Sequence, residues 1–201
     1  GIRSHIDEVP SIFLGTSVIS VYELVASYGV FASGGVHVEP YIVSRIEDKS
    51  GNVLASFTPQ KREIISQETA YRMLSLLRSV VDQGSGRRLR AVYKLEGPIG
   101  GKTGTTQNSA DGWFMSVHPN IVMGTWVGAD DPAVHFSGMY YGQGAAMALP
   151  IQGLFLQKAY ADRTTGISPA ATWSVPESLR GVSFDCEDAN LPADEDGDEF
   201  F

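Results

Sequence analysis

The chain has 201 residues, of which 43% are apolar, and this suits one globular domain with its own hydrophobic core. Its net charge of −8 is concentrated at the C-terminal end, where residues 185–201 hold eight acids and neither lysine nor arginine. The remaining chain is electrically balanced, which argues against a basic surface for nucleic acid. No run of about 18 apolar residues occurs, so no membrane-spanning helix is predicted.

Cysteine and histidine indicate neither a disulfide nor a metal site. The single cysteine, Cys186, has no internal partner and lies among acids that disfavour its thiolate. The four histidines show none of the spacings that zinc ligands adopt. We therefore predict no cofactor and no metal.

The N-terminal part begins irregularly and then predicts a capped helix. Residues 1–16 show no periodic pattern, although the apolar run 12–14 is expected to pack against something. A helix is predicted over 20–33, because Ser20 and Glu23 have capping-box spacing and apolar residues follow at helical intervals.

A β-hairpin and a second helix are predicted next. The hairpin has strands over 41–46 and 53–57 around a polar turn at 48–51. The helix covers 66–83, with Ser66 as its N-cap. Its buried stripe is predicted to consist of Ala70, Met73, Leu74, Leu77, Val80 and Val81. Three arginines follow, Arg87, Arg88 and Arg90, and we interpret them as the solvated start of a helix.

The second half predicts three consecutive antiparallel strands and a third helix. Lys102 lies on the first strand, and the others cover 112–118 and 121–127. Bulky residues on both faces of 112–118 indicate a sheet that is covered on both sides. The helix covers 150–160, begins with a proline in its first turn and has its larger apolar side chains on one side. These side chains are Ile151, Leu154 and Phe155.

The stretch Gly101-Lys102-Thr103-Gly104-Thr105-Thr106 is the strongest candidate for a functional site. The ammonium of Lys102 can hold an anion or tune a nucleophile, and the hydroxyls of Thr103 and Thr105 can bind a carboxylate. The absent side chain of Gly104 lets a substrate approach the backbone, and a strand N–H can stabilise an oxyanion. The alternative interpretation is a basic residue in a glycine-rich hairpin. A phosphate-binding loop is disfavoured, because the first glycine is one residue too close to the lysine.

The order of several segments resembles the C-terminal half of the transpeptidase domain of class A penicillin-binding proteins. The resemblance runs from about residue 1 to residue 160. The matching segments are 14–17, 23–28, 31–35, 40–42, 46–48, 80–81, 84–86, 101–106, 111–114 and 126–132. Ser85 stands where this family usually has threonine, and Gly112 stands where it more often has another small residue.

The resemblance implies an α+β fold and serine acyl transfer on D-Ala-D-Ala stem peptides of peptidoglycan, with β-lactams as inhibitors. Lys102 and Thr105 would be catalytic, the lysine through the proton network and the threonine N–H as an oxyanion donor. Substrate binding would involve Thr103, Gly104, Thr105 and Thr106. Alternatives are a D,D-carboxypeptidase, a β-lactamase relative, a non-catalytic interaction module, or a binding domain that uses its acidic tail.

The family has three motifs, Ser-x-x-Lys, Ser-x-Asn and Lys-Thr-Gly. The first two are not found in their expected places in this chain. No serine has a lysine three residues later, and the only Ser-x-Asn, Ser50-Gly51-Asn52, falls in the predicted hairpin turn. We expect the chain to be a fragment that is inactive and soluble alone. Its parent is expected to carry an upstream glycosyltransferase domain and an inner-membrane anchor, with this part in the periplasm.

The predicted organisation has three parts: a transpeptidase portion over 1–163, an extended segment over 164–186 and an acidic disordered tail over 187–201. Trp173, Val175 and Phe184 are the expected anchors of the segment. In this family the last strand of the sheet pairs with a strand that this chain lacks. We therefore expect an exposed sheet edge and association of copies through it.

Overall fold

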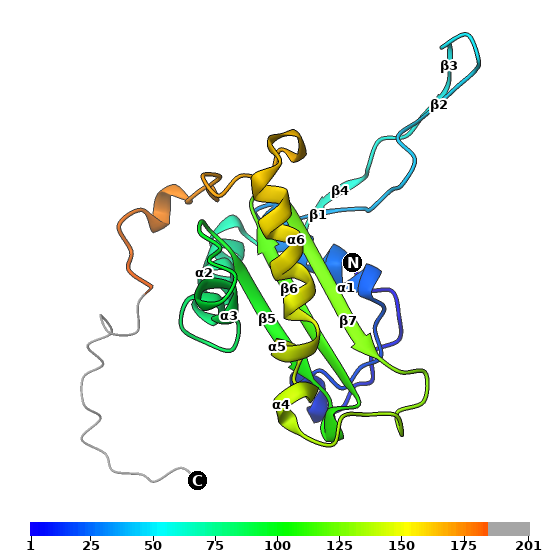
Figure 1. Ribbon diagram of the computed structural model, residues 1–201. Helices are drawn as coiled ribbons and strands as arrows, with labels where there is room; N and C mark the ends of the chain where they lie inside the picture. Colours follow the sequence, from blue (N-terminus) through cyan, green and yellow to red (C-terminus); the bar gives the residue numbers. More distant parts are fainter. Residues whose placement is uncertain (185–201) are drawn as a thin grey trace.

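A three-stranded antiparallel sheet forms the centre of the computed structural model, which describes residues 1–184 (Figure 1). Its strands follow one another as β5 (Gly100–Thr105), β6 (Asp111–His118) and β7 (Ile121–Gly128). Lys102 lies opposite Met115 of β6, so the lysine is on the first strand, as predicted. The α+β fold class and the three consecutive strands are confirmed.

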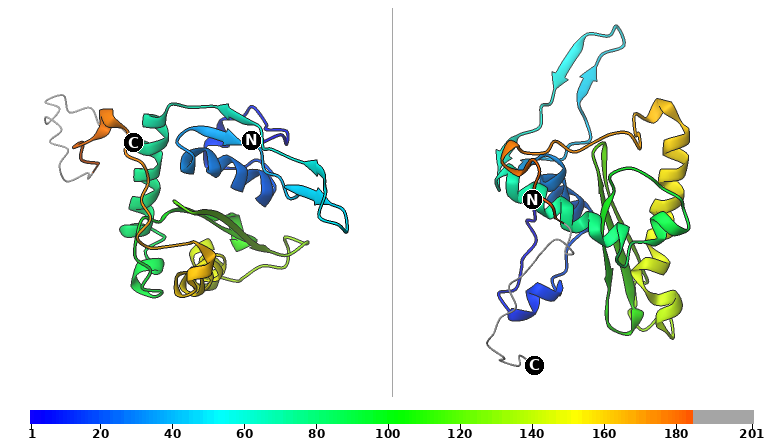
Figure 2. Two further views of the ribbon diagram at one scale, coloured as in Figure 1. Left: turned by 90° about the horizontal axis from the view of Figure 1, so that it is seen from above. Right: turned by 90° about the vertical axis from the view of Figure 1, so that its left-hand side faces the viewer.

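Helices cover both faces of this sheet (Figure 2). They are α1 (Val21–Ala32), α2 (Gln67–Asp82), α3 (Arg88–Ala91), α4 (Met139–Gly142), α5 (Gly144–Met147) and α6 (Leu149–Ala161). Helix α1 packs on β6 and β7, and α2 packs on β5 and touches α1. Helices α5 and α6 contact β6 and β7 from the opposite face. The prediction of a sheet covered on both sides is confirmed.

The alternation of side chains along β6 explains why the core has two layers. Phe114 is fully buried in a cluster that includes Leu149 of α6. Val117 is fully buried on the other face, against Leu74 and Leu77 of α2. The sheet therefore joins two apolar clusters and holds α2 and α6 on its two faces.

Local signals place the beginnings of α1 and α2. The Ser20 hydroxyl accepts the N–H of Glu23 at 3.2 Å, and the glutamate side chain completes the predicted capping box. The Ser66 hydroxyl accepts the N–H of Thr69 at 3.2 Å in the same way. The predicted stripe of α2 is largely buried, but Met73 remains 36% exposed at its margin.

Helix α6 presents its larger apolar side chains to solvent. Ile151, Leu154 and Phe155 share one side, as expected, and each is about half exposed. The side that faces the sheet instead carries Leu156 and the buried polar residue Gln152. Size and apolarity alone therefore do not identify the buried side of this helix.

A two-part β-ribbon projects from the body (Figure 1). In it β1 (Val36–Val38) pairs with β4 (Lys61–Glu63), and β2 (Arg45–Glu47) pairs with β3 (Val53–Ser56). The predicted hairpin is confirmed, but its first strand, expected over 41–46, starts too early in the prediction, because β2 begins only at Arg45. The ladder is interrupted near Pro40 and Pro59, which have no N–H to donate.

A short helix, α3, does begin at Arg88, and Arg87 is exposed, as the sequence interpretation expects. Arg88 and Arg90 are not solvated, however, and this corrects that interpretation. Arg90 forms an ion pair with Asp82 at 2.8 Å and donates to the carbonyl oxygens of Leu95 and Gly97. Arg88 donates to the carbonyl oxygen of Ala145 at 2.9 Å, 57 residues away in the chain. Arg90 therefore holds the segment before β5 in place, and Arg88 ties α3 to α5.

The remaining elements of the described chain are short 3-10 helices: η1 (Pro10–Leu14), η2 (Gln107–Ser109), η3 (Arg163–Thr165) and η4 (Glu177–Leu179). In η1 the expected packing is not seen, since Phe13 is 92% exposed. Trp173 packs against the α2 cluster and Phe184 against Tyr71, whereas Val175 is 40% exposed. Cys186 and the predicted tail over 187–201 lie outside the described residues.

Residues 1–184 contain no helix that is both long and apolar enough to cross a bilayer. The same part of the chain has no group of three or more histidine, cysteine, aspartate or glutamate side chains placed to hold a metal ion.

Candidate active site

Lys102 lies in β5, on an edge of the sheet that borders no other strand in residues 1–184. Its side chain is exposed, and its Nζ donates to the carbonyl oxygen of Thr103 at 2.6 Å. Within the described chain no carboxylate forms an ion pair with it. An exposed ammonium without a carboxylate partner can hold an anion.

The register of the ladder directs part of the β5 backbone toward the same edge. Thr106 donates its N–H to the carbonyl oxygen of Asp111 at 3.2 Å. Antiparallel ladders alternate between hydrogen-bonded and non-hydrogen-bonded pairs. Thr105, opposite Gly112, therefore directs its N–H away from β6, and so does Thr103 two residues earlier. A strand N–H in this position can donate to an oxyanion.

The hydroxyl of Thr105 is hydrogen-bonded to the backbone of α5. It accepts the N–H of Gly144 at 3.0 Å, 39 residues away in the chain. No side chain fits at Gly144, because a Cβ would collide with the carbonyl oxygens of Gly104 and Trp113. The glycine at position 144 therefore lets α5 approach β5 closely enough to make this hydrogen bond.

The hydroxyl of Thr103 meets a serine from the bend after α2. Thr103 Oγ1 and Ser85 Oγ lie 2.7 Å apart. The sequence resemblance draws attention to Ser85 as a replacement for threonine, but not to its partner. Nothing in the local sequence points to Gly144, whose contribution depends on the packing of α5.

Thr106 stabilises the turn that follows β5. Its hydroxyl accepts the N–H of Asp111 at 2.9 Å and so closes the connection to β6. The turn is tight, since Asn108 and Ser109 both have positive φ values, 59° and 56°. Four of the predicted residues, Lys102 to Thr105, thus lie along the open part of β5, and Thr106 lies at its end.

Ser50 lies in the projecting ribbon and has turn geometry. The carboxylate of Asp48 accepts the N–H of Ser50 at 2.8 Å and the N–H and side-chain amide of Asn52 at 2.9 and 2.8 Å. The interpretation of Ser50-Gly51-Asn52 as a turn is therefore confirmed.

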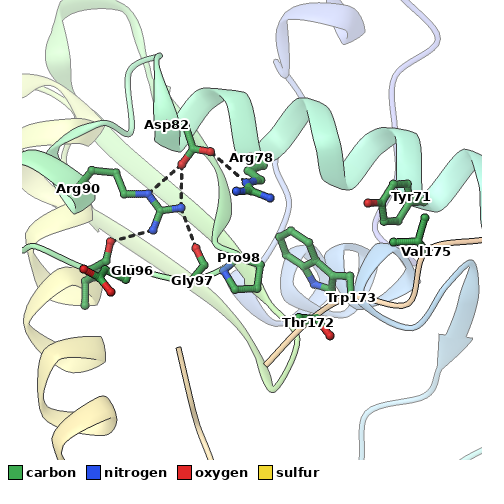
Figure 3. Close-up of a pocket in the computed structure, with 11 residues that line it drawn as sticks. Tyr71, Arg78, Asp82, Arg90, Glu96, Gly97, Pro98, Thr172, Trp173 and Val175 are labelled. Atoms are coloured by element: carbon green, nitrogen blue, oxygen red, sulfur yellow. Dashed lines mark hydrogen bonds and ion pairs between the residues drawn. The ribbon is translucent and has the colours of Figure 1, made fainter. Parts of the chain in front are cut away.

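A separate pocket of about 540 Å³ lies between α2, the segment before β5 and the C-terminal segment (Figure 3). Arg78, Asp82 and Arg90 form a chain of ion pairs on one side, with Pro98 and Trp173 opposite. None of the residues from Lys102 to Thr106 lines it. The pocket is therefore distinct from the candidate site on β5.

Comparison with known proteins identifies relatives of the same kind. Residues 13–153 match the family model described as "Penicillin binding protein transpeptidase domain". The chain is 29% identical to Penicillin-binding protein 1A of Pseudomonas aeruginosa, over 89% of this chain and 27% of that protein. It is 36% identical to Penicillin-binding protein 1A of Aquifex aeolicus, over 70% of this chain and 19% of that protein.

A solved structure shows the same arrangement. The crystal structure of Penicillin-Binding Protein 1A from Haemophilus influenzae has a TM-score of 0.69 and 26% sequence identity. The match covers 79% of this chain and 28% of that one. The chain thus spans little more than a quarter of the length of these relatives at most. With the family match extending over most of its length, the chain belongs to the penicillin-binding protein transpeptidase domain family.

Proposed function

We propose that this chain is the part of a peptidoglycan D,D-transpeptidase that binds the substrate carboxylate and helps to form the oxyanion hole. The observation that carries the proposal is the open edge of β5, which carries Lys102, Thr103 and Thr105. Within the described residues the Lys102 ammonium has no carboxylate partner. Membership of the transpeptidase-domain family supports the same reaction class.

In the proposed reaction a serine hydroxyl attacks the carbonyl carbon of a D-Ala-D-Ala bond. The C–N bond breaks, the terminal D-Ala leaves with a proton on its nitrogen, and an acyl ester remains on the serine. An amine of a second stem peptide then attacks the ester, forms the cross-link and releases the serine. A β-lactam would acylate the same serine by opening its ring amide.

Each of the predicted site residues, 102–106, has its own role in this proposal. Lys102 would support the proton network and attract the substrate carboxylate. Thr103 and Thr105 would donate hydrogen bonds from their hydroxyls to this carboxylate. Gly104 would let the substrate approach the strand, and Thr106 would border the site. The N–H of Thr105 would donate to the oxyanion, and removing such a donor typically costs about 2.7–4 kcal/mol of transition-state stabilisation.

The nucleophile has to come from outside these 201 residues, because no serine here has a lysine three positions later. The chain alone would then be inactive. The complete protein would carry the Ser-x-x-Lys and Ser-x-Asn motifs, a glycosyltransferase domain and an inner-membrane anchor, with this part on the periplasmic side. Its partners would be stem peptides and β-lactams.

The open edge of β7 supports a further part of the proposal. β7 pairs with β6 alone among the described strands, so its other edge offers unpaired N–H and C=O groups. Separated from the rest of the protein, copies of the chain would associate through this edge.

Intact mass spectrometry after incubation with benzylpenicillin tests the proposed reaction. The full-length protein is expected to gain the mass of one penicillin molecule, whereas the 201-residue chain is expected to gain none. Lys102→Ala in the full-length protein should slow the acylation, because the anion loses its cation. An adduct on the isolated chain would contradict the external nucleophile, and no adduct on either would favour a non-catalytic interaction module.

A second assay separates transpeptidation from its hydrolytic relatives. When a D-Ala-D-Ala peptide is supplied together with an acceptor amine, the full-length protein is expected to release D-Ala and form the new amide. Release of D-Ala with only the shortened acid as product would identify a D,D-carboxypeptidase. Rapid hydrolysis of penicillin would identify a β-lactamase relative.

A further inference from the structure

Ser85 reaches the candidate site from outside the Lys-Thr-Gly strand. Its Oγ lies 2.7 Å from Thr103 Oγ1, across 18 residues of sequence. The bend that carries it is well fixed, since the N–H groups of Gly84 and Gly86 donate to the carbonyl oxygens of Ser79 and Val80 at 3.0 and 2.9 Å. The hydroxyl of Ser85 is therefore presented to β5 at a defined place.

The tight packing of this bend limits how far Ser85 can move. A Cβ at Gly84 would lie 2.9 Å from the Cα of Val80, and one at Gly86 would lie 3.1 Å from the carbonyl oxygen of the same valine. The two glycines thus allow the chain to fold back onto the end of α2. Ser85 stands between them as the residue whose side chain points to the strand.

A hydroxyl has one proton to donate and two lone pairs to accept with. If Thr103 used its proton on Ser85, it could not donate to a substrate carboxylate. If Ser85 donates instead, Thr103 accepts that bond and keeps its own proton for the ligand. A negatively charged ligand favours the second arrangement, because a hydrogen bond to a carboxylate is stronger than one to a neutral hydroxyl.

Thr105 shows the same arrangement with a partner that can only donate. Its hydroxyl accepts the backbone N–H of Gly144 at 3.0 Å, which occupies a lone pair and leaves its proton free. Two threonine hydroxyls on one strand are thus each contacted by a group from another element. For Thr105 the contact orients the threonine as a donor, because a backbone N–H cannot accept.

We propose that Ser85 is a positioning residue that donates to Thr103 and thereby sets the Thr103 hydroxyl as a proton donor to the carboxylate of a bound peptide or penicillin. This inference rests on the proposed function. In this inference Ser85 does not contact the reacting atoms. The effect of removing its hydroxyl on the acylation rate should therefore depend on whether the ligand carries the carboxylate.

The test compares acylation of the full-length protein by benzylpenicillin and by its methyl ester, which lacks the negative charge. Ser85→Ala should lower the second-order rate constant for benzylpenicillin by about fivefold to tenfold, the effect of losing one orienting hydrogen bond. The rate constant for the methyl ester should fall clearly less in the same variant, because the ester presents only a neutral acceptor to Thr103.

Two control variants make the comparison specific. Ser85→Thr keeps the hydroxyl, so its acylation rate with benzylpenicillin should stay close to that of the unaltered protein. Ser79→Ala removes a hydroxyl from the last turns of α2 that bonds only the carbonyl oxygen of Ser75, and it should leave both rates unchanged.

The outcomes separate this inference from the proposed function. Equal loss with both compounds, or no loss with either, would overturn the positioning role of Ser85 while leaving the proposed function intact. Failure of the unaltered full-length protein to react with benzylpenicillin would overturn the proposed function, and this inference with it.

Discussion

Glu23 ties the first residues of the chain to α1 through a carboxylate that accepts from several donors. Its Oε1 accepts the N–H groups of Arg3 and Ser4 at 2.9 and 2.8 Å, and its Oε2 accepts the hydroxyls of Ser4 and Ser20 at 2.7 and 3.0 Å. These bonds, led by the Ser4 hydroxyl, lower the pKa of Glu23 from 4.5 to about 2. The carboxylate thus needs its charge in order to hold the N-terminal segment.

This shift predicts an acid-dependent loss of stability. A carboxyl whose pKa is lower in the folded state stabilises the fold fully above its unfolded pKa, and that contribution disappears as the pH falls through the folded value. Urea unfolding midpoints of the chain should therefore exceed those of Glu23→Gln at pH 7, and the difference should shrink between pH 4.5 and about 2. A difference independent of pH would show that the charge is unimportant.

At the scale of elements, α6 is joined to the sheet by a buried polar network as well as by apolar contact. Gln152 accepts the Ser116 hydroxyl at 2.6 Å and donates to the Phe114 carbonyl oxygen at 2.8 Å and the Thr125 hydroxyl at 3.0 Å. Gln152 is only 2% exposed, so water cannot replace a missing partner at this place. One side chain thus connects α6 to both β6 and β7.

Removal of this amide should be costly. Gln152→Ala is expected to lower the free energy of unfolding by about 1–3 kcal/mol, because the buried Ser116 hydroxyl and Phe114 carbonyl lose their partner. Urea unfolding monitored by circular dichroism measures the change. Gln157→Ala is the matched control, since that amide bonds only the Tyr93 carbonyl oxygen on an exposed part of α6. Equal losses in the two variants would contradict the importance of the buried network.

At the scale of the whole molecule, the sheet leaves one edge of β7 without a strand partner in residues 1–184. Trp126, near the end of this strand, is 40% exposed. The projecting ribbon provides a second apolar surface, with Leu54 67% exposed. The proposal assigns association to the edge of β7, and introducing a lysine on each surface in turn tests that assignment.

Light scattering over a wide concentration range should show association of the 201-residue chain. Trp126→Lys should reduce it, because a charge on an edge strand opposes pairing with another strand. Leu54→Lys, the matched control on β3, should leave it unchanged. A monodisperse monomer at all concentrations would rule out the proposed association, and a response to Leu54→Lys alone would assign it to the ribbon.

Local sequence signals are sufficient to predict the elements whose causes lie within a few residues. The capping box of α1 spans four residues, the Ser66 cap spans four, and the strands β6 and β7 follow each other through a two-residue turn. Alternating apolar residues in β6 were sufficient to predict two buried faces. The Lys-Thr-Gly segment and the segments around it were likewise sufficient to predict the family.

Which distant groups meet on β5 and around it depends on how the elements pack. Ser85 and Thr103 are 18 residues apart, Thr105 and Gly144 are 39 apart, and Arg88 and Ala145 are 57 apart. The packing also decides that α6 turns Gln152 toward the sheet and its larger apolar side chains to solvent. Spacing predicts which side chains share a face, but the partners of that face depend on how distant segments pack, and no local pattern records it.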